Sequence, residues 1–452
     1  MKISKIKTRT FKSSGFRIDA SFHLSDGVVV RRKIAASPYK IMKVGDVANQ
    51  IFYGNRAKRV YVQKCENGIP FLSSSDILQA NLENVKLASK KYTPCIEQMR
   101  LQEGWILISR SGTIGNTAWA TKQHAQKLAS EDVIRIDPNN ILRAGFVYAY
   151  LSSSYGHSLL TQGTFGAVIQ HIEPDFVASL PIPQFPAKFQ EKVDNLIKES
   201  ARLRDEATAS LEKAVSYFNK KYPFPNIGKT FFSKKTNDLK FSWAAYNNNL
   251  GVDLFVNSYK SSALKLSSLT TKIFSPPLFK HIYLKYDNGH PFMTGSELTK
   301  FNMRYYRWLS PKGVKDINDY IVSSGMLLLY KSGTIDGGIL GNTYIVDEEL
   351  NGCCLSDHVI RICFKENKNA LWTFAFLKSN GGVHLLQRLA TGTMIPFITS
   401  DRLGEIFIPK PDVEYENVAK WVSQYILKIS EAKRFENKAV SLIEKEIDGW
   451  NA

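Results

Sequence analysis

The chain carries the same series of short motifs twice, in the same order. Gly68-Ile-Pro-Phe-Leu72 recurs 221 residues later as Gly289-His-Pro-Phe-Met293. The segment 104–114, GWILISRSGTI, recurs at the same spacing as 325–335, GMLLLYKSGTI. Three more pairs follow 226 residues apart: 130–136 with 356–362, 151–154 with 377–380, and 182–183 with 408–409. Ordered motifs at near-constant spacing indicate an internal duplication, so the sequence predicts two domains of the same fold.

Each copy ends in a long segment with the pattern of a helix. The segments 186–221 and 412–452 contain no proline or glycine apart from Pro186 and Gly449. Their apolar residues recur mostly at three- and four-residue steps: Phe189, Val193, Leu196, Leu203, Ala207, Leu211, Ala214 and Phe218, then Tyr415, Val418, Val422, Tyr425, Ile429, Ala432, Ala439 and Ile443. This narrow stripe predicts a coiled-coil pair of helices. The alternative is that each helix packs on its own domain.

The copies themselves have the pattern of mixed α/β domains. Runs such as Trp105–Ser109 and Val133–Ile136 are typical of strands, and stretches such as Gly145–Ser153 and Ala370–Lys378 are typical of helices. We expect an irregular sheet in each domain, in the α/β class. The predicted layout is a first domain at 1–185, a first helix at 186–221, a linker at 222–237, a second domain at 238–411 and a second helix at 412–452.

The charge balance favours a polyanionic partner. The chain has 60 Lys and Arg against 41 Asp and Glu, a formal net charge of +19, which favours nucleic acid as the partner. The five cysteines form no C-x-x-C pair, which argues against a disulfide framework or a zinc site. No apolar run is long enough to span a bilayer, and no apolar segment of a signal peptide follows the basic N-terminus. We therefore expect a cytoplasmic location.

Motifs of catalytic sites are incomplete throughout the sequence. Ser275-Pro-Pro-Leu278 resembles the catalytic loop of adenine methyltransferases, but Leu278 stands where an aromatic ring would stack on the flipped base. The segment 226–230 resembles the end of a phosphate-binding loop, but Pro223 occupies the place of its first glycine. Glu131 and Asp132 lie near Arg135 without the lysine of a nuclease motif. The sequence thus predicts a non-catalytic chain that binds no metal and no cofactor.

Two turns at the ends of apolar strands are the best candidates for contacts with DNA. Each combines a cation, hydroxyl groups and a glycine, which suits contacts to phosphates or base edges. The alternative is a structural turn whose hydroxyls bond to nearby backbone. The candidates in these turns are Ser109, Arg110, Ser111 and Thr113, then Lys331, Ser332 and Thr334. Weaker candidates are Ser73, Ser74, Ser75, Thr294, Ser296, Gln170 and His171.

These motifs carry a family resemblance. The series of segments 68–72, 104–115 and 180–183, leading into a long helix, resembles the target-recognition domain of Type I restriction-modification specificity subunits. The order of domain, helix, domain and helix is similar to that family over the whole chain. The second copy departs from the pattern at Tyr330, Lys331 and Asp336, and its closing segment 407–410 is looser.

The resemblance implies a bipartite reader of DNA. It implies that the two helices pack antiparallel as a spacer, and that each domain reads one half of an asymmetric double-stranded DNA site. It also implies two adenine methyltransferase (modification) subunits and two motor-nuclease (restriction) subunits as partners. Those partners would bind the S-adenosylmethionine, ATP and Mg, and this chain would bind none of them.

Three other functions stay open at this point. One is a specificity subunit of a related bipartite system, in which methylation and cleavage are combined in a single partner chain. A second is a self-sufficient DNA-modifying enzyme, which the missing catalytic motifs disfavour. A third is a coiled-coil scaffold that binds only protein, for which the net charge of +19 would have no purpose.

Overall fold

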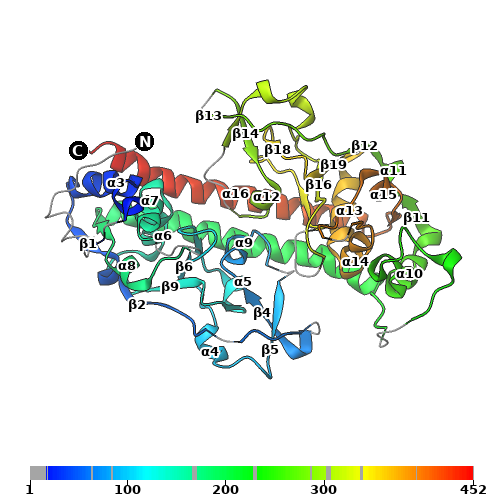
Figure 1. The fold of residues 1–452 in the computed structure, drawn as a ribbon, viewed down its shortest axis with the longest axis horizontal. Helices are drawn as coiled ribbons and strands as arrows, with labels where there is room; N and C mark the ends of the chain where they lie inside the picture. The colour runs from blue at the N-terminus through cyan, green and yellow to red at the C-terminus, as the bar shows by residue number, and fades with distance from the viewer. Residues whose placement is uncertain are drawn as a thin grey trace. The chain divides into compact units, whose positions relative to one another are not determined.

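The computed structural model describes residues 17, 19–56, 58–62, 65–82, 85–164, 170–227, 232–285, 288–301, 307–335, 340–392 and 394–450. The chain divides into two compact units (Figure 1). The first unit comprises residues 1–205 with 431–452, and the second comprises 206–430. Each unit therefore holds one copy of the repeat, together with part of both long helical segments, 186–221 and 412–452. We call the part of each unit outside those two helices its head.

The strands of the first head form three sheets. One four-stranded sheet has the order β2 (Ala48–Tyr53), β9 (Val133–Pro138), β6 (Ile106–Ser109) and β7 (Thr117–Trp119). The other has the order β3 (Tyr61–Val62), β5 (Lys86–Ser89), β4 (Gly68–Leu72) and β8 (Leu128–Ala129). A third pair joins β1 (Ile41–Lys43) to β10 (Pro181–Pro183).

The second head repeats this topology strand for strand. Its sheets have the orders β12 (Thr270–Phe274), β19 (Val359–Phe364), β16 (Leu327–Tyr330) and β17 (Thr343–Ile345), then β13 (Tyr283–Leu284), β15 (Arg307–Leu309), β14 (His290–Met293) and β18 (Cys354–Leu355), with β11 (Ala263–Lys265) paired to β20 (Phe407–Pro409). Even the registers agree: Phe71 lies opposite Leu128 in the first head, and Phe292 lies opposite Cys354 in the second. The two mixed α/β heads are thus copies of one fold.

The expected irregular sheet is instead divided into two four-stranded sheets and one two-stranded sheet in each head. One continuous segment supplies β8 to the sheet that contains β4 and β9 to the sheet that contains β6, with the turn at residues 130–132 between them. The Ser130 N–H still donates to the Leu72 carbonyl of β4, at 3.0 Å. Strands of two to six residues can change sheets at such a turn, which motif spacing in a sequence does not reveal.

One helix in each head begins with the same serine cap. The Ser153 hydroxyl, at the start of α7, accepts from Gly156 N at 3.1 Å, and the Ser379 hydroxyl accepts from Gly382 N at 3.2 Å at the start of α14. The α-helices of the first head are α2 (Ala20–His23), α3 (Asp26–Ala35), α4 (Ile96–Met99), α5 (Lys122–Ala125), α6 (Ala144–Ser152), α7 (Ser154–Gln162) and α8 (Pro174–Ala178). Those of the second are α10 (Leu250–Asn257), α11 (Leu266–Leu269), α12 (Gly295–Leu298), α13 (Asn367–Lys378), α14 (Asn380–Arg388) and α15 (Ser400–Gly404). The repeated motif at 151–154 and 377–380 is therefore a helix cap.

Two long helices, α9 (Ala187–Lys221) and α16 (Tyr415–Asp448), contribute to both units. In the first unit, the Ser200 hydroxyl donates to the Ala432 carbonyl at 2.8 Å. In the second, Lys428 donates to Glu206 at 2.9 Å, and the Tyr217 hydroxyl donates to Asp412. Along α9 from Ser200 to Tyr217, the contacted residue changes from Ala432 to Asp412. The two helical segments therefore pair antiparallel.

The coiled-coil interpretation of the apolar stripe is confirmed, and each helix also packs on a head other than its own copy. Val193 and Ile443 are fully buried in one core with Phe146 of the first head. In the second unit, the ring centroid of Phe218 lies 4.8 Å from that of Trp372 in α13. The stripe thus packs on the partner helix and on a head at once. None of the helices in the described part of the chain combines the length and hydropathy that crossing a membrane requires.

Candidate nucleic-acid interface

The two candidate turns, residues 109–113 after β6 and 330–334 after β16, are held by the same backbone hydrogen bonds. Arg110 N donates to the Asp132 carbonyl at 2.8 Å, and the Arg110 carbonyl accepts from Ile172 N at 3.3 Å. In the second head, Lys331 N donates to the His358 carbonyl at 2.9 Å, and the Lys331 carbonyl accepts from Ile398 N at 2.7 Å. The duplication has kept the backbone of this turn, while the side chains on it have changed.

In the first turn, hydroxyl groups hold the local shape. Ser109 is fully buried, and its hydroxyl hydrogen-bonds to the Ser111 carbonyl at 3.1 Å and to the Thr113 hydroxyl at 2.8 Å. Gly112 has a φ of +71°, which favours glycine. Ser109 and Thr113 therefore have a structural role, since their hydroxyls bond within the turn. Ser111 is only half-buried.

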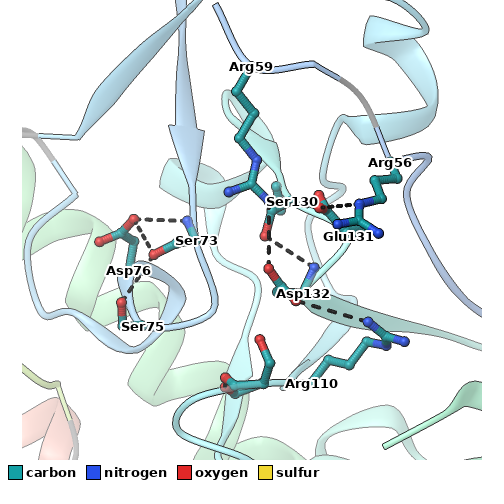
Figure 2. A network of polar contacts seen from close by, with 12 residues as sticks. Arg56, Arg59, Ser73, Ser75, Asp76, Arg110, Ser130, Glu131 and Asp132 are labelled. Carbon is teal, nitrogen blue, oxygen red and sulfur yellow. Dashed lines mark hydrogen bonds and ion pairs between the residues drawn. The ribbon is translucent and has the colours of Figure 1, made fainter. Parts of the chain in front are cut away.

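Arg110 lies in an ion-pair cluster on the same turn. One guanidinium nitrogen lies 2.5 Å from Glu173 Oε1, and the other lies 4.0 Å from Asp132 Oδ1 (Figure 2). The guanidinium carbon also lies 4.7 Å from the ring centroid of Tyr53. Its buried Nε–H has no acceptor within the described residues. Arg110 is thus partly buried and held by acids and a ring, with one donor unused.

Lys331, the equivalent cation, is held by a hydroxyl group instead of a carboxylate. Its Nζ donates to the Ser275 hydroxyl at 2.9 Å, and that hydroxyl donates to the Asp357 carbonyl at 2.6 Å. Burial lowers the pKa of Lys331. The Ser275-Pro-Pro-Leu278 loop therefore anchors the second turn. Beside it, the Ser332 hydroxyl lies 2.8 Å from His358 Nδ1, whereas Thr334 is exposed.

The weaker candidate set lies at the start of two short helices, the 3-10 helix Asp76–Leu78 and α12. Ser73 donates its hydroxyl to Asp76 at 2.6 Å, and Thr294 donates to Glu297 at 2.9 Å. Burial of Glu297 would raise its pKa, but hydrogen bonds from Thr294 and the nearby Arg307 hold that pKa below its ordinary value. Ser73 and Thr294 are therefore structural, whereas their neighbours Ser75 and Ser296 are exposed.

The structure brings these two candidate sets together in each head. A Cβ added at Gly112 would lie 3.9 Å from the Ser74 hydroxyl, and one added at Gly295 would lie 1.7 Å from Tyr330 Cε2. The third set joins them in the first head: His171 pairs with Ser111 as an isolated β-bridge, and Gln170 is exposed. In the first head, residues 109–113, 73–75 and 170–171 thus form one surface. We call this surface, and its equivalent at 330–334 and 294–296 in the second head, the turn face.

Sequence reasoning missed two arginines beside the turn face of the first head. Arg59 lies 2.8 Å from Glu131, and Arg56 lies 3.9 Å from the same oxygen with 91% of its side chain exposed (Figure 2). Burial disfavours the charge of Arg59, but the hydrogen bond and charge of Glu131 raise its pKa overall. Neither arginine belongs to a repeated motif. The only sequence signal near them is the acidic motif at 130–132, whose Glu131 lies close to both.

In each head, one buried arginine donates hydrogen bonds to the backbone next to the turn face. Arg135 donates to the carbonyls of Ser130, Val133, Met99 and Ala129, at 2.7–3.4 Å. Arg361 donates to the carbonyls of Ser356, Val359, Tyr320 and Leu355 in the same way. Both are fully buried, and burial lowers the pKa of each to about 10. Arg135 therefore holds the turn at 130–132 through its backbone and does not pair with Glu131 or Asp132.

Comparisons with known proteins give a family match for the first head. Residues 36–202, which contain most of the first head, match the family model described as the Type I restriction modification DNA specificity domain. A comparison with curated protein sequences finds no significant match. No group of three or more His, Cys, Asp or Glu side chains is placed to hold a metal ion in the described parts of the chain.

Solved structures that are similar to the chain include the Type I restriction-modification S subunit from M. genitalium, at 13% identity over 90% of this chain and 94% of that one, with a TM-score of 0.30. Another is the HsdS subunit from Thermoanaerobacter tengcongensis, at 14% identity over 91% and 97%, with a TM-score of 0.30. These likenesses assign no role to any residue here. Residues 36–202 thus match a Type I restriction modification DNA specificity domain, and the second head repeats the topology of the first strand for strand.

Proposed function

We propose that the chain reads a bipartite, asymmetric DNA site, with one half-site for each head. One observation carries this proposal: the same backbone frame presents different side chains in the two heads. Arg110 is replaced by Lys331, and the exposed Gln170 by Pro396. Because base readout depends on which side chains reach the base edges, two such heads are suited to two different half-sites.

We further propose that the chain has no catalytic activity of its own and positions partner subunits. Adenine methyltransferase subunits and motor-nuclease subunits would supply methylation and cleavage, and would bind S-adenosylmethionine, ATP and Mg. The antiparallel pair of α9 and α16 is suited to a spacer, because a continuous helix of 35 residues fixes a separation along its axis. In a related system, the same role would be filled by one fused partner, which co-purification would reveal as a single species of partner chain.

The methylome of the source organism tests this proposal. We expect methylated adenines in a motif of two unlike half-sites separated by a spacer of undefined sequence, and we expect this motif to vanish when the gene is deleted. Long-read sequencing that detects methyladenine makes the measurement in both strains.

Removal of seven residues around Leu203, together with seven facing residues of α16, should shorten the spacer and leave both half-sites unchanged, because the helices set the distance between the half-sites and the heads set their sequences.

The purified chain is the control for this experiment. Without partner subunits it should transfer no methyl group from S-adenosylmethionine and should cut no DNA. Methyl transfer by the chain alone would contradict the non-catalytic role. A continuous or palindromic motif that depends on this gene would contradict the two-headed reading.

Arg56 should contribute to DNA affinity without contributing to sequence choice. Its exposed guanidinium lies at the turn face of the first head, held only loosely by Glu131 at 3.9 Å. In Arg56→Ala, we expect weaker binding to all sequences and a log–log salt slope that is smaller by about 1, as for one lost phosphate contact. Arg434→Ala is the matched control, because Arg434 is also exposed and lies 3.6 Å from Glu431 in α16. An unchanged slope in Arg56→Ala would exclude this contact.

A further inference from the structure

The second head exposes apolar side chains beside its turn face. Met394 is 92% exposed, Ile395 is 70% exposed and Phe397 is 42% exposed. Ile398, the next residue, is buried in the core of the unit. Exposed apolar residues that gather at one place mark a surface for binding more often than scattered ones do. We call residues 394–397 the apolar tip.

Backbone hydrogen bonds fix the base of the apolar tip to the second turn. Thr391 and Phe397 exchange N–H···O bonds of 2.8 and 2.7 Å, so the chain folds back on itself between them. Gly333 N donates to the Pro396 carbonyl at 3.0 Å, and Ile398 N donates to the Lys331 carbonyl at 2.7 Å. The Tyr246 hydroxyl donates to the carbonyl of Gly392, whose φ is +96°. The tip is therefore presented by a fixed base, next to the cation and hydroxyls of the turn.

The first copy of the repeat has a related sequence at the same place. At the repeat spacing of 226 residues, Gly392, Met394 and Ile395 correspond to Gly166, Val168 and Ile169. Residues 165–169 lie outside the described residues, so this likeness is one of sequence alone. Two large apolar residues nonetheless follow the glycine in both copies, although neighbouring positions such as Gln170 and Pro396 have changed.

We propose that Met394 and Ile395 form a wedge that enters double-stranded DNA and partly unstacks one base step of the second half-site. Side chains such as Met, Ile, Pro and Phe act in this way in proteins that kink DNA, because unstacked base faces accept apolar contacts that water does not offer. The neighbouring turn has the second requirement of such a wedge, since the exposed hydroxyl of Thr334 can contact a flanking phosphate. This inference rests on the proposed function, because the wedge needs the turn face to lie on DNA.

Permanganate footprinting tests the wedge, because permanganate oxidises unstacked thymines. The full chain, assembled with its co-purifying partner subunits, is bound to a duplex that carries the DNA sequence identified by the methylome experiment. Thymine opposite the methylated adenine is left out of the comparison, since a methyltransferase also disturbs that pair. We expect the wild-type complex to make one step of the second half-site reactive. In Met394→Gln/Ile395→Thr that reactivity should vanish, and binding should weaken about tenfold. Val413→Thr is the control, because Val413 is 93% exposed and lies outside the turn face.

The possible results separate the wedge from the proposed function. If the tip variant footprints and binds like the wild type, the wedge is wrong while the two-headed reading stands. If the variant loses its partner subunits but the chain keeps its DNA affinity, the tip is a protein-docking site and the wedge is wrong. If the wild-type complex itself does not bind the duplex, both the wedge and the proposed function are wrong.

Discussion

Arg361→Met should destabilise the second unit by about 3–5 kcal/mol. The guanidinium of Arg361 donates to three backbone carbonyls in β18, β19 and the turn between them, and to the carbonyl of Tyr320. Methionine fills much of the same volume but donates no hydrogen bond, so these carbonyls lose their charged donor inside the protein. Hydrogen bonds to charged groups contribute more than neutral ones, and the cost of orphaned acceptors adds to their loss.

Urea unfolding and hydrogen exchange would measure this effect. We expect a lower urea midpoint and a loss of amide protection in β18 and β19, with little change in β8 and β9. Arg135→Met should reverse the pattern, since Arg135 makes the same contacts in the first head. Lys312→Met is the control for loss of an exposed cation in the second head. Equal protection in β19 of wild type and Arg361→Met would refute a supporting role for this arginine.

The second large effect is expected at Gly295, where the two heads solve one packing problem differently. A Cβ at Gly295 would lie 1.7 Å from Tyr330 Cε2 and 2.2 Å from Cδ2, so the Tyr330 ring rests on the glycine. The first head has Ser74 and Ser109 at the equivalent positions. Gly295→Ala should therefore destabilise the second head by about 1–3 kcal/mol through overpacking, although alanine is the better helix former.

A double-mutant cycle separates overpacking from a loss of backbone freedom. Tyr330→Ser removes the ring and should also destabilise, because the ring packs against the core of the second head. The double variant should be more stable than the two single effects predict, by about 1 kcal/mol or more. Gly404→Ala is the control, since a Cβ there would meet its nearest atom at 3.5 Å, an ordinary contact. Additive effects in the cycle would show that ring and glycine do not compete for space.

The candidate residues divide according to what their side chains touch. Arg110 and Lys331 are cations at the end of apolar strands in the sequence, and the structure surrounds each with acceptors of its own head. Which of them also reaches DNA stays a prediction. Exposure favours Ser75, Ser296 and Thr334, together with Gln170, because their side chains lie at the surface of the turn face.

The sequence by itself determined the duplication, the α/β heads and the two long helices. Repeats and apolar periodicity are local patterns: strand β6, for example, was expected at Trp105–Ser109 and is observed at Ile106–Ser109. The same patterns identified the turn at 109–113, because a glycine between hydroxyls after an apolar strand is a local signal.

Only the tertiary structure decided which of these residues meet and which face inward. Arg135 and Glu131 are four residues apart in the sequence, yet β9 buries Arg135 while Glu131 remains at the surface beside Arg56. The turn and the cap are separated by some 35 residues in the chain, and they meet because β4 and β8 pair in parallel and carry the chain between two sheets. Such contacts depend on long-range pairing and on the space left by other side chains, which local patterns do not encode.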